Sequence, residues 1–333
     1  MKLGLAGTGR IGTTHAEILR QISGVDSVVV ADADVERARR AAAKVGVESV
    51  DGIDALFESG VDGLVVTAAT DAHPELIIKA VDAGIPVFCE KPVAADVPGT
   101  LVVLDRIGSS EVPVQIGFQR RFDAGYVAAR EAVRSGRLGW IHTVRATTFD
   151  AAPPPAEYIP HSGGLFRDCS VHDFDIIRWV TGREVVEVYA LGANRGAAFF
   201  AEAGDVDCAA AVLTLDDGTI ALVSAGRYNA AGYDVRLELL GSQDSAAVGL
   251  DERLPLRSLE SGVSWPSGPA YPGFMERFRP AYVRELEVFV SVARGEAESP
   301  CGVADALAAF YVAEACELSR RERRPVRLDE VRG

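Results

Sequence analysis

The residues with the clearest chemical meaning lie at the start of the chain. Gly7, Gly9 and Gly12 form a Gly-x-Gly-x-x-Gly pattern between a short apolar run and a segment with helical spacing. About twenty residues after the last glycine, a second apolar run ends in Asp32. A strand, a glycine turn, a helix and an acid at the end of the second strand form the dinucleotide-binding fingerprint. The sequence therefore predicts a site for a nicotinamide or flavin dinucleotide.

Each residue of this turn has a physical role in the prediction. Gly7 allows the tight turn, Gly9 lets the backbone approach the pyrophosphate, and Gly12 lets the helix pack closely on the strand. Arg10 and Ile11 complete the segment that we assign to the cofactor. The amide groups and the positive end of the first helix favour the phosphates.

The residues near the adenosine ribose indicate which dinucleotide binds. Asp32 can accept hydrogen bonds from both ribose hydroxyls and would repel a 2′-phosphate, which favours NAD over NADP. Arg37 and Arg39 are close enough in the sequence to accommodate such a phosphate. We favour the interpretation that both arginines are solvated residues of a helix over 34–44.

A lysine follows the fifth strand of the predicted parallel sheet, in the sequence Cys89-Glu90-Lys91-Pro92. Ligands of doubly wound sheets bind at the carboxyl ends of the strands, so Lys91 is expected to point toward the nicotinamide. The alternative is an ordinary surface lysine. The X-Pro bond favours a fixed turn, for which the cis form is accessible, and such a turn would aim the lysine inward.

A second group of chemically capable residues follows a glycine pair. Asp168, His172 and Asp175 are spaced i, i+4 and i+7, which predicts one polar face on a helix over 168–180. Burying such a stripe is costly unless its members pair or meet a ligand. A satisfied structural network and a ligand site both explain it. Gly163 and Gly164, which allow close approach of the backbone to a ligand, favour the site.

The elements that position these residues divide into two domains. Alternating strands and helices predict an α/β Rossmann domain, a doubly wound parallel sheet, over 1–118. Residues 119–333 are expected to form an α+β domain for substrate binding and oligomerisation, with a large, mainly antiparallel open sheet. For its C-terminal helix, packing on the first domain is an alternative to packing within the second. The expected strands are 2–6, 27–31, 47–50, 63–67, 85–89 and 112–118 in the first domain, and 140–149, 185–193, 208–215, 219–226 and 233–240 in the second.

Composition excludes several classes of function. The chain has 333 residues, of which 48% are hydrophobic and 25% charged, and its net charge of −14 argues against nucleic acid and anionic membranes as partners. No apolar run is long enough to span a bilayer, and no export signal precedes the first strand. Five scattered cysteines without metal-ligand spacing indicate reduced thiols in a cytoplasmic protein and no metal site.

These motifs together resemble the Gfo/Idh/MocA family of oxidoreductases. The Rossmann glycines, Glu90-Lys91-Pro92 and the Gly-Gly…Asp…His…Asp segment occur in the family's order, and the resemblance covers essentially the whole chain. Within the family, the segment 115–123 and the 163–175 segment are most similar to the inositol 2-dehydrogenases and related sugar or polyol dehydrogenases. The resemblance implies NAD-dependent oxidation of a secondary hydroxyl on a cyclic polyol or sugar.

The resemblance also implies roles for individual residues. Lys91, Asp168 and His172 would form the catalytic triad, with His172 as general base hydrogen-bonded to Asp168 and Lys91 stabilising the developing alkoxide. The implied substrate contacts add Arg120, His161, Asp175 and Tyr233, and the implied cofactor contacts add Thr67, Ala69, His73 and Glu90. For His73, a capping or packing role is an equal alternative.

One departure from the family pattern concerns the substrate pocket. Inositol dehydrogenases commonly have Tyr-Gly-Tyr-Asp in a late strand, and this chain has Ala231-Gly232-Tyr233-Asp234. A pocket without the first phenol would accept a larger sugar or another stereoisomer, unless Tyr228 or Asn229 replaces it.

Other functions and an oligomeric state remain open at this level. One alternative is an oxidoreductase acting on another aldose, and a second is a redox-neutral glycosidase that uses NAD transiently. A non-catalytic NAD-dependent sensor has no need for Lys91 and the Asp-His pair. The apolar alternation of strands 185–191 and 209–215 predicts contact with another subunit, in a dimer or a homotetramer.

Overall fold

A computed structural model describes residues 1–332, which form two compact units. The first unit consists of Met1–Gln119 and Pro280–Leu307. The second consists of Arg120–Arg279 and the chain from Ala308 onward. Among the helices of residues 1–332, none has the length and apolar character needed to cross a membrane.

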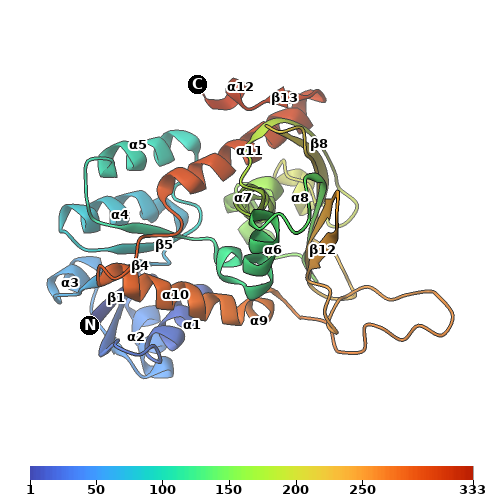
Figure 1. The fold of residues 1–333 in the computed structure, drawn as a ribbon. Helices are drawn as coiled ribbons and strands as arrows, with labels where there is room; N and C mark the ends of the chain where they lie inside the picture. The colour runs from blue at the N-terminus through green and yellow to red at the C-terminus, as the bar shows by residue number, and fades with distance from the viewer. Residues whose placement is uncertain (333) are drawn as a thin grey trace. The chain divides into compact units, whose positions relative to one another are not determined.

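The first unit is built on a parallel sheet with the strand order β3-β2-β1-β4-β5-β6 (Figure 1). Almost every residue of the central strands is buried, because helices lie on both faces of the sheet. The strands are β1 (Lys2–Ala6), β2 (Ser27–Ala31), β3 (Glu48–Ser49), β4 (Gly63–Val66), β5 (Val87–Glu90) and β6 (Val114–Gly117). The helices are α1 (Arg10–Leu19), α2 (Val35–Val45), α3 (Ile53–Glu58), α4 (His73–Asp82), α5 (Val97–Ile107) and α10 (Arg279–Ala293). This arrangement confirms the predicted Rossmann sheet.

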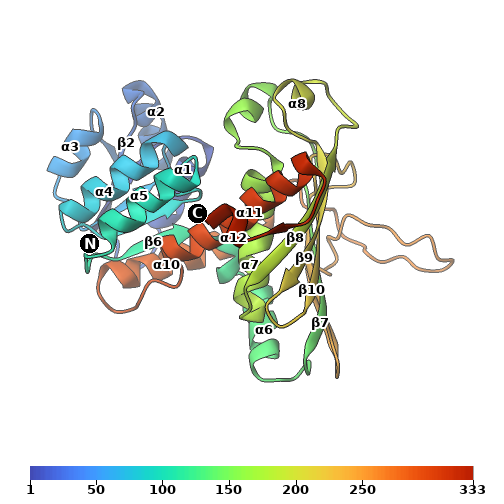
Figure 2. The same ribbon diagram turned by 90° about the horizontal axis from the view of Figure 1, so that it is seen from above.

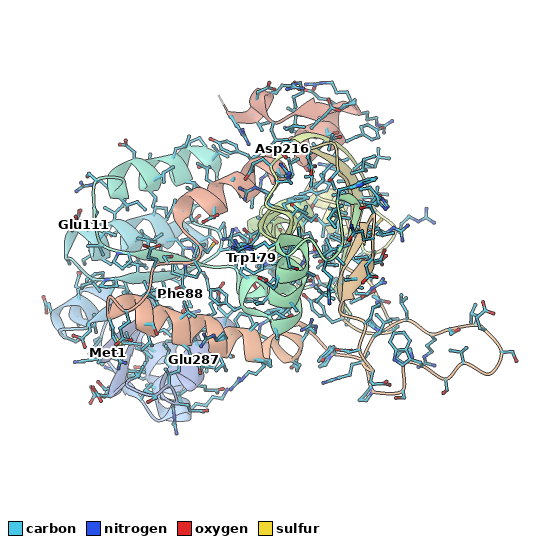
Figure 3. The ribbon with its side chains drawn as sticks, viewed as in Figure 1. Met1, Phe88, Glu111, Trp179, Asp216 and Glu287 are labelled. Atoms are coloured by element: carbon cyan, nitrogen blue, oxygen red, sulfur yellow. The ribbon has the colours of Figure 1, made fainter. Side chains whose placement is uncertain are left out.

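Helix α10 belongs to this unit although it is distant in the sequence. The ring of Phe289 in α10 packs against Phe88 of β5, with 5.8 Å between the ring centroids (Figure 3). Gln115 of β6 donates a hydrogen bond to the backbone carbonyl of Glu285 at 3.1 Å. The core of the first unit therefore includes side chains from both ends of the chain.

The second unit is built on a seven-stranded sheet in the order β12-β11-β7-β10-β9-β8-β13. Its strands are β7 (Ile141–Phe149), β8 (Val185–Ala193), β9 (Cys208–Leu215), β10 (Ile220–Gly226), β11 (Asp234–Gly241), β12 (Ser245–Val248) and β13 (Val326–Arg327). All neighbouring pairs are antiparallel except β7 and β10. The expected open, mainly antiparallel sheet is confirmed, and Gly218, with φ of +87°, lies in the turn between β9 and β10.

Helices cover one face of this sheet (Figure 2). They are α6 (Ala124–Arg134), α7 (Val171–Thr181) and α11 (Val303–Glu322), of which α11 begins in the first unit. Shorter helices are α8 (Phe199–Glu202), α9 (Phe274–Arg277) and α12 (Asp329–Arg332). Helices α6 and α7 pack side by side, and the Arg130 guanidinium lies 4.2 Å from the centroid of the Trp179 ring (Figure 3).

The predicted helix over 168–180 differs from the observed structure. Residues Phe166–Ser170 form a π-helical turn, and regular α-helix begins only at Val171. Asp168 lies in this π turn, whereas His172 and Asp175 lie in the regular α-helix that follows. The expected alignment of the three side chains on one face stays a prediction.

Candidate active site

The glycine turn has the geometry that the sequence predicts. Gly7 has φ of +98°, and a Cβ at this position would lie 2.4 Å from the amide nitrogen of Ala68. A Cβ on Gly12 would lie 2.0 Å from the carbonyl oxygen of Gly7, so helix α1 can approach β1 only with glycine there. A Cβ on Gly9 would meet no atom within 4 Å. The protein itself leaves the backbone of Gly9 accessible, which fits a phosphate at this place.

Helix α1 begins immediately after this open glycine. Arg10 and Ile11 are its first residues, and Gly9 is the N-cap without a side-chain partner for the helix amides. Thr67, at the end of β4, donates a hydrogen bond of 2.6 Å to the Gly7 carbonyl and so fixes the turn from the neighbouring strand.

Asp32 is buried and its two carboxylate oxygens are already engaged. Oδ2 accepts hydrogen bonds from the amide and the hydroxyl of Thr8, at 2.7 and 2.9 Å. Oδ1 accepts from the Asp34 amide at 3.0 Å and from Arg37 Nη2 at 2.8 Å. Burial disfavours the ionised carboxylate, but the hydrogen bonds favour it more strongly, so the pKa of Asp32 is lowered.

The two arginines near Asp32 differ from each other. Arg37 is an exposed residue of α2, as expected, and it also forms an ion pair with Asp32. The sequence spacing did not show this because α2 begins at Val35 and turns Arg37 back toward the strand end. Arg39 is solvated as expected and pairs with Glu36 and Asp51 on the surface.

The other expected cofactor residues lie near the carboxyl ends of β4 and β5. Ala69 is exposed at the start of a short 3-10 turn. His73 is buried, and its ring nitrogens lie 2.7 Å from the Pro92 carbonyl and 3.1 Å from the Ala68 carbonyl. This geometry favours a packing role for His73, which joins the loops after the two strands. Glu90 pairs with the buried His15 of α1 at 2.7 Å.

Lys91 follows β5 directly and is half-buried. Its peptide bond to Pro92 is cis. Lys91 belongs to the first unit, whereas Asp168 and His172 belong to the second.

Asp168 is held by two donors from separate elements. Arg227, which follows β10, donates Nη2 to Asp168 Oδ2 at 2.6 Å, and the Tyr158 hydroxyl donates to Oδ1 at 2.9 Å. The same guanidinium donates Nη1 to Asp150 at 3.0 Å and to the Cys169 sulfur at 2.8 Å. Burial and the nearby Asp168 charge raise the pKa of Tyr158, which keeps its hydroxyl protonated as a donor.

His172 lies in the first turn of α7 and is half-buried. The next residue, Asp173, is fully buried and accepts hydrogen bonds from Arg120 and Thr148. Asp175, also fully buried, accepts two hydrogen bonds from Arg121, at 2.9 and 2.6 Å. The α7 carboxylates therefore serve to anchor the helix to the segment that follows β6.

These ion pairs give structural partners to two residues that we expect to contact the substrate. Arg120 is 2% exposed and directs its guanidinium to Asp173, and Asp175 is 0% exposed and directs its carboxylate to Arg121. Both side chains have a structural partner that the sequence did not reveal, because the partners are more than 50 residues away. Arg120 and Asp175 therefore help to position α7, and their contact with a substrate hydroxyl stays a prediction.

The remaining expected substrate residues have contrasting environments. His161 is exposed at the end of the 3-10 helix Ala156–His161. Tyr233 is buried, and burial raises the pKa of its phenol well above the usual range. Ala231 is exposed, and the Tyr228 hydroxyl accepts a hydrogen bond from the Ala197 amide at 3.1 Å.

Sequence reasoning missed Arg227, Tyr158 and Asp150. The available signal was a charged residue directly after the apolar strand 219–226, since an arginine at such a strand end is usually paired when buried. Tyr158 and Asp150 lie around a proline-rich loop with no periodic pattern, which gave no comparable signal.

Two family models match the chain. Residues 1–118 match the oxidoreductase family with an NAD-binding Rossmann fold, and residues 126–247 match the GFO/IDH/MocA C-terminal domain.

Several known proteins are similar over nine-tenths or more of their length. The chain is 37% identical to the myo-inositol dehydrogenase of Streptomyces leeuwenhoekii over 90% of each chain. It is 36% identical to the myo-inositol 2-dehydrogenase of Thermotoga maritima over 100% of both chains. The crystal structure of scyllo-inositol dehydrogenase from Lactobacillus casei with bound NAD(H) and scyllo-inositol matches with a TM-score of 0.87 at 29% identity, covering 99% of both chains.

Proposed function

Because the chain belongs to the Gfo/Idh/MocA family of oxidoreductases, we propose that it oxidises a secondary hydroxyl of a cyclic polyol of the inositol type. NAD, which accepts the hydride when bound, is the cofactor. The residues of the first unit fit this cofactor, since Gly9 leaves its backbone open at the start of α1 and Asp32 is an ionised acceptor at the end of β2.

The observation that carries the proposal is that two hydrogen bonds fix Asp168, which precedes His172 by four residues in the chain. A carboxylate fixed by Arg227 and Tyr158 keeps its orientation, which a partner of a catalytic imidazole requires. His172 follows four residues later, is half-buried, and has a side chain suited to take a hydroxyl proton near neutral pH. We assign the proton transfer to His172 and its orientation to Asp168.

Lys91 has the complementary role in the proposal. Its ammonium follows the strand end at which Rossmann folds bind their ligands. A fixed positive charge there would orient the hydroxyl and stabilise the alkoxide that develops as the proton leaves. Lys91, Asp168 and His172 are the proposed catalytic residues, and Tyr233 and His161 are the proposed additional substrate contacts.

The test is a comparison of two histidine variants with a panel of inositol isomers and aldoses. His172→Ala should lower the turnover rate about a hundredfold or more while leaving NAD affinity within about twofold. His142→Ala, which removes an exposed histidine of β7, is the matched control and should retain activity. A His172→Ala enzyme as active as the control would remove His172 from the mechanism.

The same panel separates the alternatives. A dehydrogenase accumulates reduced NAD in proportion to polyol consumed, whereas a redox-neutral glycosidase releases sugar from a glycoside without net reduced NAD. Ala231 and the engagement of Tyr228 with Ala197 support a pocket that lacks one phenol, so we expect activity on more than one isomer. Ala231→Tyr should narrow that range.

We also propose that the exposed face of the seven-stranded sheet joins two copies of the chain, in a dimer or a homotetramer. On this face, Tyr189 of β8, Val212 of β9 and Leu222 of β10 lie in register across three strands, and all three are exposed. Such a continuous apolar row supports a subunit contact. Light scattering should give a multiple of the 35.3 kDa chain mass, and Val212→Glu with Leu222→Glu should give the monomer.

The proposed location is the cytoplasm, where the NAD pool and reducing conditions are found. The thiols of Cys89, Cys208 and Cys316 form no disulfide, which supports this proposal. Cell fractionation with an antibody to the chain should recover it with cytoplasmic markers, and recovery outside the cytoplasm would contradict the proposal.

A further inference from the structure

A buried acid–histidine pair joins the helix after the glycine turn to the strand before Lys91, within the first unit. His15 lies in the second turn of α1, and its Nε2 is 2.7 Å from Oε1 of Glu90, the last residue of β5. The His15 side chain is 0% exposed and that of Glu90 is 11% exposed. Because water is largely excluded, this contact is stronger than the same contact would be at the surface.

The surroundings of the pair restrict both side chains. Gly117 of β6 is the partner of Glu90 across the sheet, and a Cβ on Gly117 would lie 3.0 Å from Glu90 Oε2. The carboxylate therefore lies where a larger residue at position 117 would crowd it. The rings of Phe88 and Tyr282 pack against His15, with their centroids 5.7 and 5.5 Å from that of the imidazole. The pair is thus enclosed by the sheet, α1 and α10.

A second buried carboxyl faces Glu90 and differs from it in having no partner. Neither oxygen of Glu285 in α10 has a hydrogen-bond partner among residues 1–332, whereas Glu90 has His15. Two neighbouring buried carboxyls disfavour a second negative charge, because like charges repel. Burial and the Glu90 charge raise the pKa of Glu285. We therefore place the proton on Glu285 and the negative charge on Glu90.

We propose that the His15–Glu90 pair positions Lys91, an inference that rests on the catalytic role proposed above for Lys91. Successive side chains of an extended chain point to opposite sides of the backbone. A Glu90 side chain that is fixed toward α1 therefore sets the direction in which Lys91 leaves the end of β5. His15 and Glu90 are positioning residues in this proposal, since they act through Lys91. The alternative is the direct cofactor contact expected for Glu90.

The two buried acids provide a matched pair of variants. Glu90→Gln and Glu285→Gln make the same chemical change in the same region, but only the first removes the charge that pairs with His15. Glu90→Gln should lower kcat by about tenfold or more through misplacement of Lys91 and leave the NAD Kd, measured by calorimetry without polyol, within about twofold. Glu285→Gln should keep both values within about twofold.

Two outcomes of this comparison would overturn the proposal. A weaker NAD affinity in Glu90→Gln with unchanged kcat would make Glu90 a cofactor contact. Equal losses of kcat in both variants would show a general effect of changing a buried acid.

The position of Lys91 can also be followed by NMR without turnover. Methylation of the amines with a ¹³C label keeps their charge, and the chain has only four lysines: Lys2, Lys44, Lys79 and Lys91. The Lys91 signal is the one that disappears in Lys91→Arg. Glu90→Gln and His15→Leu should shift this signal and leave those of the other three lysines in place, while Glu285→Gln should leave all four in place. An unmoved Lys91 signal in Glu90→Gln and His15→Leu would contradict the proposal.

A conservative variant of His15 separates positioning from packing, and it carries the kinetic test if Glu90→Gln does not fold. His15→Gln retains an amide that can donate to Glu90, whereas His15→Leu has no donor. The kcat of His15→Gln should exceed that of His15→Leu by about threefold or more at similar Tm. Equal kcat values would mean that the hydrogen bond to Glu90 does not matter. If the wild-type protein oxidised no polyol, the proposed function would fail, whereas the Lys91 signal would still report on the pair.

Discussion

Arg227 Nη2 lies 2.6 Å from Asp168 Oδ2, and this ion pair joins the end of a strand to the π-helical turn before His172. The Arg227 side chain is 3% exposed, so water screens the interaction little. The same guanidinium holds Asp150. A single buried cation therefore pairs with two carboxylates near the proposed general base.

Replacing Arg227 should change the pH dependence of activity as well as its size. Without the cation, the pKa of Asp150, which burial already raises, and the pKa of Asp168 should both increase. In Arg227→Met, the acid limb of the kcat/KM profile should therefore move upward by about one pH unit or more.

The control for this prediction is on β11, which is separated from β10 by β7 in the sheet. Arg236→Met removes the partner of Asp234 in β11 and should leave the profile in place. An unshifted profile in Arg227→Met, with only a lower Tm, would show that Arg227 has a purely structural role.

The Arg120–Asp173 pair should stabilise the fold of the second unit. Removal of one partner leaves a buried charge uncompensated, so Asp173→Ala should lower the free energy of unfolding by about 3–5 kcal/mol. The double variant Arg120→Met, Asp173→Leu should recover part of this loss, because it removes both charges. Urea denaturation measures both effects.

An exposed pair provides the comparison for Arg120 and Asp173. Glu287→Ala breaks the Arg284–Glu287 contact on α10 and should change the free energy of unfolding by less than about 0.5 kcal/mol. If Arg120→Met instead raised KM for the polyol with unchanged stability, Arg120 would be a substrate contact after all.

Two glycines of the same turn should respond to alanine in different ways. Gly12→Ala forces a Cβ to 2.0 Å from the Gly7 carbonyl, so it should lower Tm strongly or prevent folding. At Gly9, φ is −66° and no atom lies within 4 Å of the added Cβ, so Gly9→Ala should keep the wild-type Tm. Its NAD affinity should nevertheless fall by about tenfold or more, because the methyl group blocks the pyrophosphate.

Thermal unfolding and calorimetry separate these two effects. Wild-type NAD affinity in Gly9→Ala would mean that the pyrophosphate does not approach this glycine. A folded and stable Gly12→Ala protein would contradict the close packing of α1 on the turn.

Glu285 should make the protein less stable as pH rises. It is fully buried in α10, and burial together with the nearby Glu90 charge raises its pKa well above 4.5 in the folded state. Neither carboxylate oxygen has a hydrogen-bond partner among the described residues. The unfolded state releases the proton from about pH 4.5 upward while the folded state retains it, so stability is lost over that range until the raised pKa is reached.

Glu285→Gln removes this titration and should unfold at higher urea than the wild type at pH 8. The difference should shrink toward pH 4.5, and each unit of pKa difference is equivalent to about 1.4 kcal/mol. Two residues face Glu285, namely Glu90 and Gln115. Glu90 in turn pairs with His15. A pH-independent effect of Glu285→Gln would show that the carboxyl is not protonated in the folded state.

Local patterns predicted the parts of the structure that depend on neighbouring residues. The strands β8 and β9 have the predicted bounds, and the glycine turn has the predicted geometry, because alternation and backbone freedom are properties of short segments. The role of Gly12 in packing could be named from its position alone.

Features that depend on distant partners could not be predicted in this way. The π turn Phe166–Ser170 has no periodic signal, and the partners of Asp173 and Asp175 come from a segment more than 50 residues earlier. Strand β13 has two residues and is defined only by its pairing with β8. The Asp168–His172 hydrogen bond and the catalytic triad remain predictions for the kinetic test.

The two-part composition of the first unit has a consequence for synthesis. The backbone carbonyl of Glu285 accepts a hydrogen bond from Gln115, and the two residues are 170 positions apart in the chain. The ribosome therefore synthesises the strands of the nucleotide-binding sheet long before it synthesises α10, which packs on them. Until then Phe88 lacks the ring of Phe289. A gene fragment cut after the sixth strand would thus express a nucleotide-binding sheet with a bare apolar side, prone to aggregate unless residues 280–307 are supplied as well.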